Sequence, residues 1–160
     1  MRKLVACLAC RNEGTRLYGK PLQNLDIKKN ITILKYIIEC LKKTKAIDEI
    51  VLAISKNIQN RIYENIAKKN NIKFIYGDEL DVLSRLIKSC EYANGTDIFR
   101  ITTESPFFLH EKISDIWKMH KRYNNDLTTI DDIPDGSGFE IIKLNAYKIS
   151  HKKGKKKHKI

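Results

Sequence analysis

The sequence predicts a single α/β domain built as a three-layer α/β/α sandwich of Rossmann type. A chain of 160 residues suits one domain, because a domain of that length buries roughly two thirds of the surface of its unfolded chain. The continuous apolar run Leu4 to Cys10 is typical of a strand buried on both faces. Strand-like and helix-like segments then alternate, which predicts parallel strands joined by right-handed crossovers with helices on both faces.

The elements up to residue 101 follow from this alternation. Thr32 is a plausible N-cap for a helix whose apolar residues recur at i, i+3, i+4 and i+7, namely Leu34, Ile37, Ile38 and Leu41. Strands are expected at 50–54, 72–76 and 98–101. Helices are expected between them, the first on Ile58, Ile62 and Ile66 and the second over 82–90.

The region after Pro106 predicts one more helix and two more strands. The apolar residues Ile113, Ile116 and Trp117 share one face of the helix. His120 lies on the same face and is expected to be packed rather than catalytic. The strands are expected at 126–130 and 139–142, around a turn with Pro134, Gly136 and Gly138.

The charge is positive and unevenly spread. The chain holds 31 Lys and Arg against 19 Asp and Glu, a formal net charge of +12. The last ten residues hold six lysines and no acid, so we expect a domain over 1–150 and a basic disordered tail over 151–160. A basic nucleic-acid-binding module is the least favoured alternative, because no aromatic-interleaved basic surface or known binding motif accompanies the charge.

Cysteine usage and hydropathy predict a soluble cytoplasmic protein. No apolar run approaches the ~18 residues of a membrane span, so no membrane partner is expected. The four cysteines lie in apolar stretches, which fits a reducing compartment without disulfides. Cys7 and Cys10 have the spacing of a metal pair, but in a strand their side chains point to opposite faces, so core cysteines are expected.

The segment after the first strand is the first candidate site. In a Rossmann-type sheet the ligand lies at the carboxyl ends of the strands. Here Arg11, Arg16 and Lys20 are interspersed with Gly14 and Gly19, which let backbone N–H groups approach an anion. The pattern is neither the dinucleotide fingerprint nor the Walker loop. A solvated basic loop is the alternative, but the position favours a polyphosphate site.

The same segment carries a family resemblance. Residues 9–22 read A-C-R-N-E-G-T-R-L-Y-G-K-P-L, which resembles the ARxxSxRLPGKxL signature of the cytidylyltransferases that activate sialic acid, 3-deoxy-manno-octulosonate and related sugars, with Tyr18 where the family has proline. The resemblance is strongest to the spore coat polysaccharide biosynthesis protein F branch. Three further segments are similar to the family's G-x-E-x-D-V-L-x-R, V-R-I-T-G-D-C-P and P-D-G-L-D-V-E motifs: 77–85, 99–106 and 134–140.

The resemblance covers about residues 3–150 and implies a nucleotide-diphospho-sugar transferase fold. It also implies that CMP passes from CTP to a sugar, of acidic nonulosonate type or related, for surface polysaccharide biosynthesis with Mg²⁺. The catalytic residues are then expected to be Arg11, Lys20 and Glu104. The expected nucleotide contacts are Leu8, Ala9, Cys10, Arg11, Asn12, Gly14, Thr15, Arg16, Lys20, Asp81, Arg85 and Thr103.

Two departures from the family pattern concern the metal. Glu104 stands in place of the family's metal-binding aspartate and can still ligate Mg²⁺ through oxygen, whereas Gly138 stands where another aspartate is expected. Glu140 is expected as a second metal ligand, with Asp135 as the alternative.

Two assignments and the class of protein stay open. Asp81 is at least as well placed to cap a helix as to contact the ligand, and Arg85 either pairs with Asp81 or faces the nucleotide. Gly138 and the early basic end keep a non-catalytic or truncated nucleotide-binding domain as the alternative function. The sequence decides neither the acceptor sugar nor whether the chain forms a homodimer.

Overall fold

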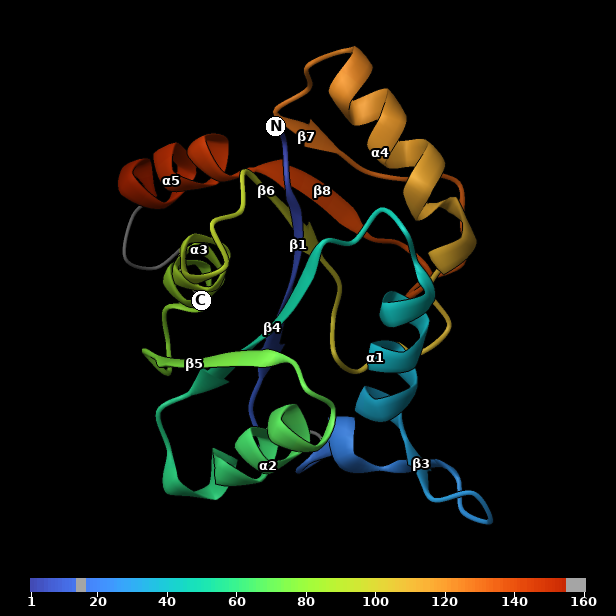
Figure 1. The fold of residues 1–160 in the computed structure, drawn as a ribbon. Helices are drawn as coiled ribbons and strands as arrows, with labels where there is room; N and C mark the ends of the chain where they lie inside the picture. The colour runs from blue at the N-terminus through green and yellow to red at the C-terminus, as the bar shows by residue number, and fades with distance from the viewer. Residues whose placement is uncertain (14–16, 155–160) are drawn as a thin grey trace.

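The computed structural model, which describes residues 1–13 and 17–154, is built around a six-stranded sheet (Figure 1). The order is β5-β4-β1-β6-β8-β7. The strands are β1 (Leu4–Cys10), β4 (Glu49–Ser55), β5 (Lys73–Gly77), β6 (Asp97–Arg100), β7 (Leu127–Thr128) and β8 (Glu140–Lys143). The first four in this order are parallel, and β8 runs antiparallel to both of its neighbours. All of the strands predicted from the sequence are present, β1 with the predicted bounds and the others with shifted ends.

Helices cover both faces of the sheet, which confirms the three-layer α/β/α prediction (Figure 1). On one face pack α1 (Ile33–Lys43), α2 (Arg61–Lys69) and α4 (Ile113–Arg122), and on the other pack α3 (Val82–Tyr92) and α5 (Leu144–Lys153). β1 contributes alternate side chains to the two cores, with Cys10 in the first and Cys7 in the second. This confirms the prediction that the two cysteines face opposite ways, and all four cysteines are free and buried.

Two helix N-caps predicted from the sequence are confirmed by hydrogen bonds. The Thr32 hydroxyl accepts from the Lys35 N–H at 3.3 Å, and the Asp81 carboxylate accepts from the Ser84 N–H at 2.9 Å. The helix-capping interpretation of Asp81 is therefore correct. His120 is fully buried and packs with α4 against the sheet, as expected.

The structure also contains elements that the hydrophobic pattern does not mark. A small hairpin joins β2 (Asn24–Asp26) to β3 (Ile31–Thr32). The described residues also form short 3-10 helices, of which η1 (Lys20–Leu22) precedes the hairpin, η2 (Ile58–Asn60) precedes α2 and η3 (His110–Lys112) precedes α4. The helix expected from Ile58, Ile62 and Ile66 exists. Its buried residues, however, are Tyr63 and Ala67, whereas Ile58 is 74% exposed.

The beginning of the basic end lies in α5, and residues 155–160 lie outside the described part. His151 on this helix places its Nε2 atom 2.7 Å from Oδ2 of Asp81 at the start of α3. The described end of α5 therefore packs next to the segment that follows β5. Across 1–13 and 17–154, no helix is both long and apolar enough to cross a membrane.

Candidate functional site

The candidate site lies between β1 and β6, where the order of the sheet reverses. From β1 the chain runs outward to β4 and β5, then crosses to β6 on the other side of β1. Pairing of β1 with β4 extends to Cys10, whereas its pairing with β6 covers only Leu4 to Ala6. Beyond Ala6, β1 and β6 are therefore no longer paired, which leaves the sheet open at the carboxyl ends of these two strands. Ligands bind at this place in such sheets.

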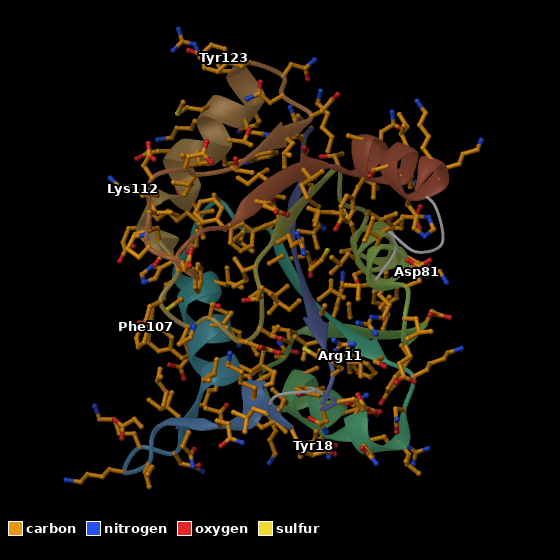
Figure 2. All side chains as sticks on the ribbon, turned by 180° about the vertical axis from the view of Figure 1, so that it is seen from behind. Arg11, Tyr18, Asp81, Phe107, Lys112 and Tyr123 are labelled. Carbon is orange, nitrogen blue, oxygen red and sulfur yellow. The ribbon has the colours of Figure 1, made fainter. Side chains whose placement is uncertain are left out.

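A cavity of about 390 Å³ occupies this opening. Its lining comes from the end of β1, from η1, from α3 and from the loop after β6: Ala9, Arg11, Lys20, Val82, Arg85, Leu86, Arg100, Ile101, Thr102, Thr103, Glu104 and Ser105. Figure 2 shows Arg11 at this end of the molecule and Tyr123, which follows α4, at the opposite end. The structure thus brings together residues from the first three motifs that the sequence singles out.

The lining is strongly cationic. Arg11, Lys20, Arg85 and Arg100 face a single described carboxylate, Glu104. The Lys20 ammonium lies 3.3 Å from Oε2 of Glu104, and these side chains are 41% and 46% exposed. An exposed pair of this kind contributes little to stability, so both groups are available to a ligand. A cluster of arginine and lysine around a cavity suits a polyphosphate.

Arg85 is the most buried cation of the cavity, with 1% of its surface exposed. Its NH1 group donates to the carbonyl oxygens of Asp78 at 3.0 Å and Glu79 at 3.3 Å. Its Nε–H is buried and has no hydrogen-bond partner within the described structure. Burial lowers the pKa of Arg85, although arginine stays protonated in proteins. The side chain therefore lines the cavity as a cation with a donor left to satisfy.

Residues at the end of β1 can offer a ligand only their main chain. The side chains of Leu8 and Cys10 are buried in the core. Burial raises the pKa of Cys10 to about 12, so its thiol stays protonated and is no nucleophile at neutral pH. Ala9 lines the cavity, and its carbonyl accepts from the Thr103 hydroxyl at 2.9 Å. Thr103 therefore fixes the loop after β6 against β1.

Asn12 anchors the loop after β1 instead of facing the cavity. Its Nδ2 group donates to the Gln59 carbonyl at 2.6 Å, and its Oδ1 accepts from the Tyr63 hydroxyl at 2.8 Å. Its backbone N–H donates to Oδ1 of the fully buried Asn60 at 2.8 Å. Gly19 closes the loop by donating to the Asn12 carbonyl at 2.9 Å, with a left-handed φ of 61° that favours glycine.

Sequence reasoning misses Asn60 and Tyr63, because no motif marks a buried asparagine that holds a loop. Three other predicted contacts, Gly14, Thr15 and Arg16, lie outside the described residues.

A second cavity of about 330 Å³ adjoins the first and shares part of its lining, Arg100, Ile101 and Thr102. The rest comes from the region of the fourth motif and from β7 onward, including Thr129, Gly138 and Glu140. Oε2 of Glu140 lies 2.6 Å from NH1 of Arg100, its partner in the β6–β8 register. Burial opposes the charge on Arg100, but this ion pair raises the pKa of the guanidinium. Arg100 is a site residue that the sequence analysis did not single out.

The acidic residues fit Mg²⁺ in one specific way. Within 1–13 and 17–154, no three His, Cys, Asp or Glu side chains form a group that could hold a metal ion alone. Glu104 lines the first cavity, whereas Glu140 lines the second and pairs with Arg100, so the two predicted ligands do not share a cavity. Mg²⁺ in phosphate-transfer sites uses one or two carboxylates plus substrate oxygens. Glu104 fits that arrangement.

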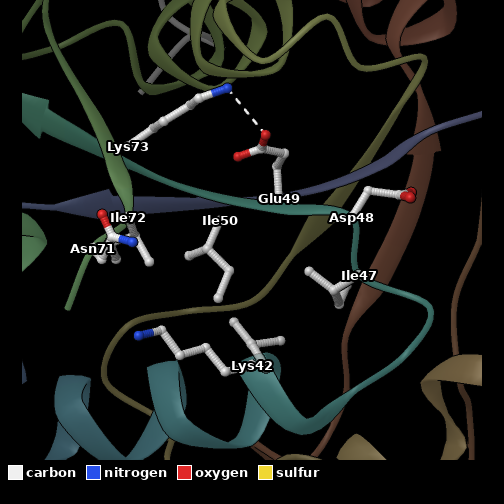
Figure 3. A pocket seen from close by; sticks show the side chains of 9 residues that line it. Lys42, Ile47, Asp48, Glu49, Ile50, Asn71, Ile72 and Lys73 are labelled. Carbon is white, nitrogen blue, oxygen red and sulfur yellow. Dashed lines mark hydrogen bonds and ion pairs between the residues drawn. The ribbon is translucent and has the colours of Figure 1, made fainter.

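Another cavity, of about 430 Å³, lies at the amino end of β4 and β5, against α1 (Figure 3). Its lining includes an ion pair between Lys73 and Glu49, whose Nζ and Oε1 atoms are 3.0 Å apart. Asp48 accepts from the Leu4 N–H at 2.8 Å. The charged groups of this cavity are therefore engaged in contacts within the fold. The cavity also lies at the opposite end of the sheet from the cationic cavity.

The family model described as cytidylyltransferase matches residues 5–159, nearly the whole chain. The chain belongs to the cytidylyltransferase family. The resemblance seen in the sequence motifs is therefore confirmed.

Relatives of this cytidylyltransferase family member are distant in sequence. The spore coat polysaccharide biosynthesis protein SpsF of Bacillus subtilis is 27% identical over 146 residues, which cover 91% of this chain and 61% of SpsF. An uncharacterized protein of Methanocaldococcus jannaschii is 26% identical over 156 residues, which cover 98% of this chain and 63% of that protein. The chain thus spans about three fifths of the length of these relatives.

Solved structures confirm the fold. A cytidylyltransferase from Leptospira borgpetersenii superposes with a TM-score of 0.87 at 21% identity, covering 97% of this chain and 66% of the other. A CMP:2-keto-3-deoxy-manno-octonic acid synthetase complexed with CTP superposes with a TM-score of 0.74 at 10% identity, covering 96% and 79%. At such identities the likeness shows a shared nucleotidyltransferase architecture.

Proposed function

We propose that this chain is the nucleotide-binding part of a cytidylyltransferase that transfers CMP from CTP to a sugar. The observation that carries the proposal is the cationic cavity at the end of β1, in a chain of the cytidylyltransferase family. Four cations and one carboxylate line this cavity, and arginine and lysine side chains bind phosphate oxygens. The synthetase that shares the fold was solved with CTP, which supports the choice of nucleotide.

The transfer needs little covalent chemistry from the protein. A sugar hydroxyl attacks the α-phosphorus of CTP, the bond from that phosphorus to the bridging oxygen breaks, and pyrophosphate leaves. Negative charge develops on the oxygens of the transferred group and of the leaving group, so positioning and neutralisation supply the catalysis. In our proposal Arg11 and Lys20 hold the phosphates from the loop after β1, and Arg85 holds the nucleotide from α3.

Main-chain groups of residues 8–10 are proposed to contact the cytosine base. Leu8 and Cys10 have their side chains in the core, and the described pairing with β6 ends at Ala6. The backbone of this segment therefore borders the open end of the sheet. Thr103, hydrogen-bonded to Ala9, keeps the opposite wall of the cavity in place.

Glu104 is proposed to hold Mg²⁺ together with phosphate oxygens of the nucleotide. When bound, the ion would supply charge neutralisation on the triphosphate. Lys20 pairs with Glu104 in the structure, so the same lysine is positioned to move onto a phosphate when the carboxylate is used. Glu140 is not proposed as a metal ligand, because its carboxylate pairs with Arg100 and lines the neighbouring cavity.

The second cavity is proposed to take the sugar. Thr102 and Thr129 offer hydroxyl groups that can hydrogen-bond sugar hydroxyls. An acidic nonulosonate or a related sugar is proposed as the acceptor, as the sequence resemblance implies. The name of the SpsF relative, a spore coat polysaccharide biosynthesis protein, supports a role in polysaccharide synthesis.

Pyrophosphate release with CTP, Mg²⁺ and a panel of acidic and neutral sugars tests the proposal, alongside direct titration of CTP. Release that depends on one class of sugar supports transfer and names that class. A chain that binds CTP without turnover with any sugar fits a second function, a nucleotide-binding part without activity of its own. Gly138, which stands where the family pattern has an aspartate, favours that alternative. A chain that binds no CTP contradicts both.

A further inference from the structure

We propose that Arg100 binds the α-phosphoryl group of CTP at the point where CMP is transferred. The inference rests on the proposed function, since it names a residue of that same site. Arg100, Ile101 and Thr102 line both the first and the second cavity, and Arg100 is the charged member of this shared wall. No other cation of the first cavity, among the described residues, also lines the second.

The position follows from the chemistry of the transfer. The α-phosphorus is bonded to the nucleoside and the pyrophosphate, and it receives the hydroxyl of the sugar. It must therefore lie where the nucleotide and acceptor cavities meet, which is the wall that contains Arg100. Charge on the non-bridging oxygens of this phosphorus rises in the transition state, and fixed donors aimed at them lower the barrier.

Arg100 has donors to spare for this role. A guanidinium carries five N–H donors in a planar fork, and Glu140 engages NH1 at 2.6 Å. The side chain is 41% exposed, so the remaining edge is accessible from the cavities. Arginine binds phosphate oxygens in a bidentate manner more readily than lysine does, because its donors are fixed in one plane.

Glu140 acts on the substrate only through Arg100 and is a positioning residue. Residues directly opposite each other on antiparallel strands share one face of the sheet, and Arg100 and Glu140 are such a pair on β6 and β8. The carboxylate therefore restrains the guanidinium at the junction of the cavities. The same contact accounts for the glutamate in the fourth motif without a metal.

Isothermal titration of cytidine, CMP and CTP into the wild-type chain and into Arg100→Gln tests the assignment. Loss of one charge-assisted contact lowers affinity by roughly ten- to hundred-fold, so Arg100→Gln should bind CMP and CTP more weakly than wild type by about that factor. Cytidine, which has no phosphate, should bind within about two-fold of wild type. Arg122→Gln is the matched control, because it removes the same charge at the far end of α4.

The outcomes separate the residue from the function. Unchanged CMP affinity in Arg100→Gln, with CTP bound by wild type, overturns the Arg100 assignment and leaves the proposed function intact. Wild type that binds neither CMP nor CTP overturns the proposed function, and the assignment falls with it. Equal weakening of cytidine and CMP also overturns the assignment, because it shows a general disturbance of the site.

Conservative variants test the positioning role. Glu140→Gln keeps an oxygen that can accept from Arg100, so it should bind CMP within about two-fold of wild type, whereas Glu140→Ala should weaken CMP several-fold. Arg100→Lys should recover part of the affinity lost in Arg100→Gln. Equal CMP affinity in Glu140→Ala and wild type overturns the positioning role.

Discussion

Gly77, the last residue of β5, lies directly against the buried side chain of Arg85: a Cβ atom at residue 77 would lie 2.6 Å from Cγ of Arg85. Real Cβ atoms essentially never approach so closely, so any side chain here must displace the arginine. Gly77 and Arg85 are also the first and last residues of the second sequence motif. The first and last residues of the motif are therefore in contact, and the missing side chain of Gly77 leaves the space that the Arg85 side chain occupies.

Gly77→Ala is predicted to lower both stability and nucleotide affinity. Overpacking a buried position costs roughly 1–3 kcal/mol, and moving Arg85 takes a cation away from the cavity. Chemical denaturation and CTP titration measure the two effects. Gly138→Ala is the control, since its Cβ would meet only the end of Ile133, at 3.3 Å. A Gly77→Ala variant with wild-type stability and CTP affinity would show that the contact does not position Arg85.

Lys20→Ala and Arg16→Ala are predicted to weaken triphosphate binding without lowering the melting temperature of the free protein. Lys20 is 41% exposed and its pair with Glu104 is solvated, so its loss should cost the fold under ~1 kcal/mol. A contact to phosphate is worth about 1.5–3 kcal/mol. Calorimetric titration of CTP checks the predicted loss of affinity, and a thermal melt checks that the melting temperature of the free protein is unchanged. Unchanged CTP affinity would return these residues to a solvated basic loop.

Glu104 and Glu140 are predicted to differ in their effect on magnesium. Glu104→Gln should reduce the gain in CTP affinity that Mg²⁺ provides, because a neutral amide is a poorer magnesium ligand than a carboxylate. Glu140→Gln is its matched control and should keep the full gain, since Glu140 pairs with Arg100. CTP titrations with Mg²⁺ and with EDTA measure the gain. A loss in Glu140→Gln alone would restore Glu140 as the ligand.

His120 is predicted to make the fold sensitive to mild acid. Burial lowers its pKa, although the Asp97 carboxylate at 3.2 Å from Nε2 acts in the opposite direction. The unfolded chain, with a histidine pKa of about 6.5, then binds the proton more readily than the folded chain. The contribution of His120 to the free energy of unfolding should therefore be complete above about pH 6.5 and should decrease as the pH drops below that value.

Chemical denaturation between pH 8 and 5 checks this, with His120→Gln as the comparison. The variant should be less stable at pH 8, because it disturbs the contacts with Asp97 and Thr128, but it should lose less stability toward pH 5. Parallel pH profiles for the two proteins would contradict the assignment.

Much of the fold could be predicted because its signals are local. The run from Leu4 to Cys10 marks a strand buried on both faces, and Thr32 and Asp81 mark helix starts through the side chains that cap them. α5 leaves no such signal, because no residue of this helix is buried and its apolar spacing is weak. The hairpin of β2 and β3 has strands of only three and two residues, too short for an alternating pattern.

The candidate site could be predicted where motifs mark it and not where it depends on pairing across the sheet. Arg11, Lys20, Arg85 and Glu104 do line one cavity, as their place after strands predicts. The proposed role of Arg100 depends on its register with Glu140, forty residues away, which the sequence alone does not specify. The separation of Glu104 from Glu140 into two cavities has the same origin.

Binding of the four nucleoside triphosphates is the most direct measurement of the central claim, that the cavity at the end of β1 takes CTP. A ligand that binds only the native state raises stability by RT ln(1 + [L]/Kd), so a thermal-shift series with and without Mg²⁺ compares the affinities. The account predicts that CTP with Mg²⁺ raises the melting temperature more than ATP, GTP or UTP does. Equal shifts for all four would leave a general phosphate site and contradict the assignment to cytidine, and no shift with any of them would contradict the nucleotide site itself.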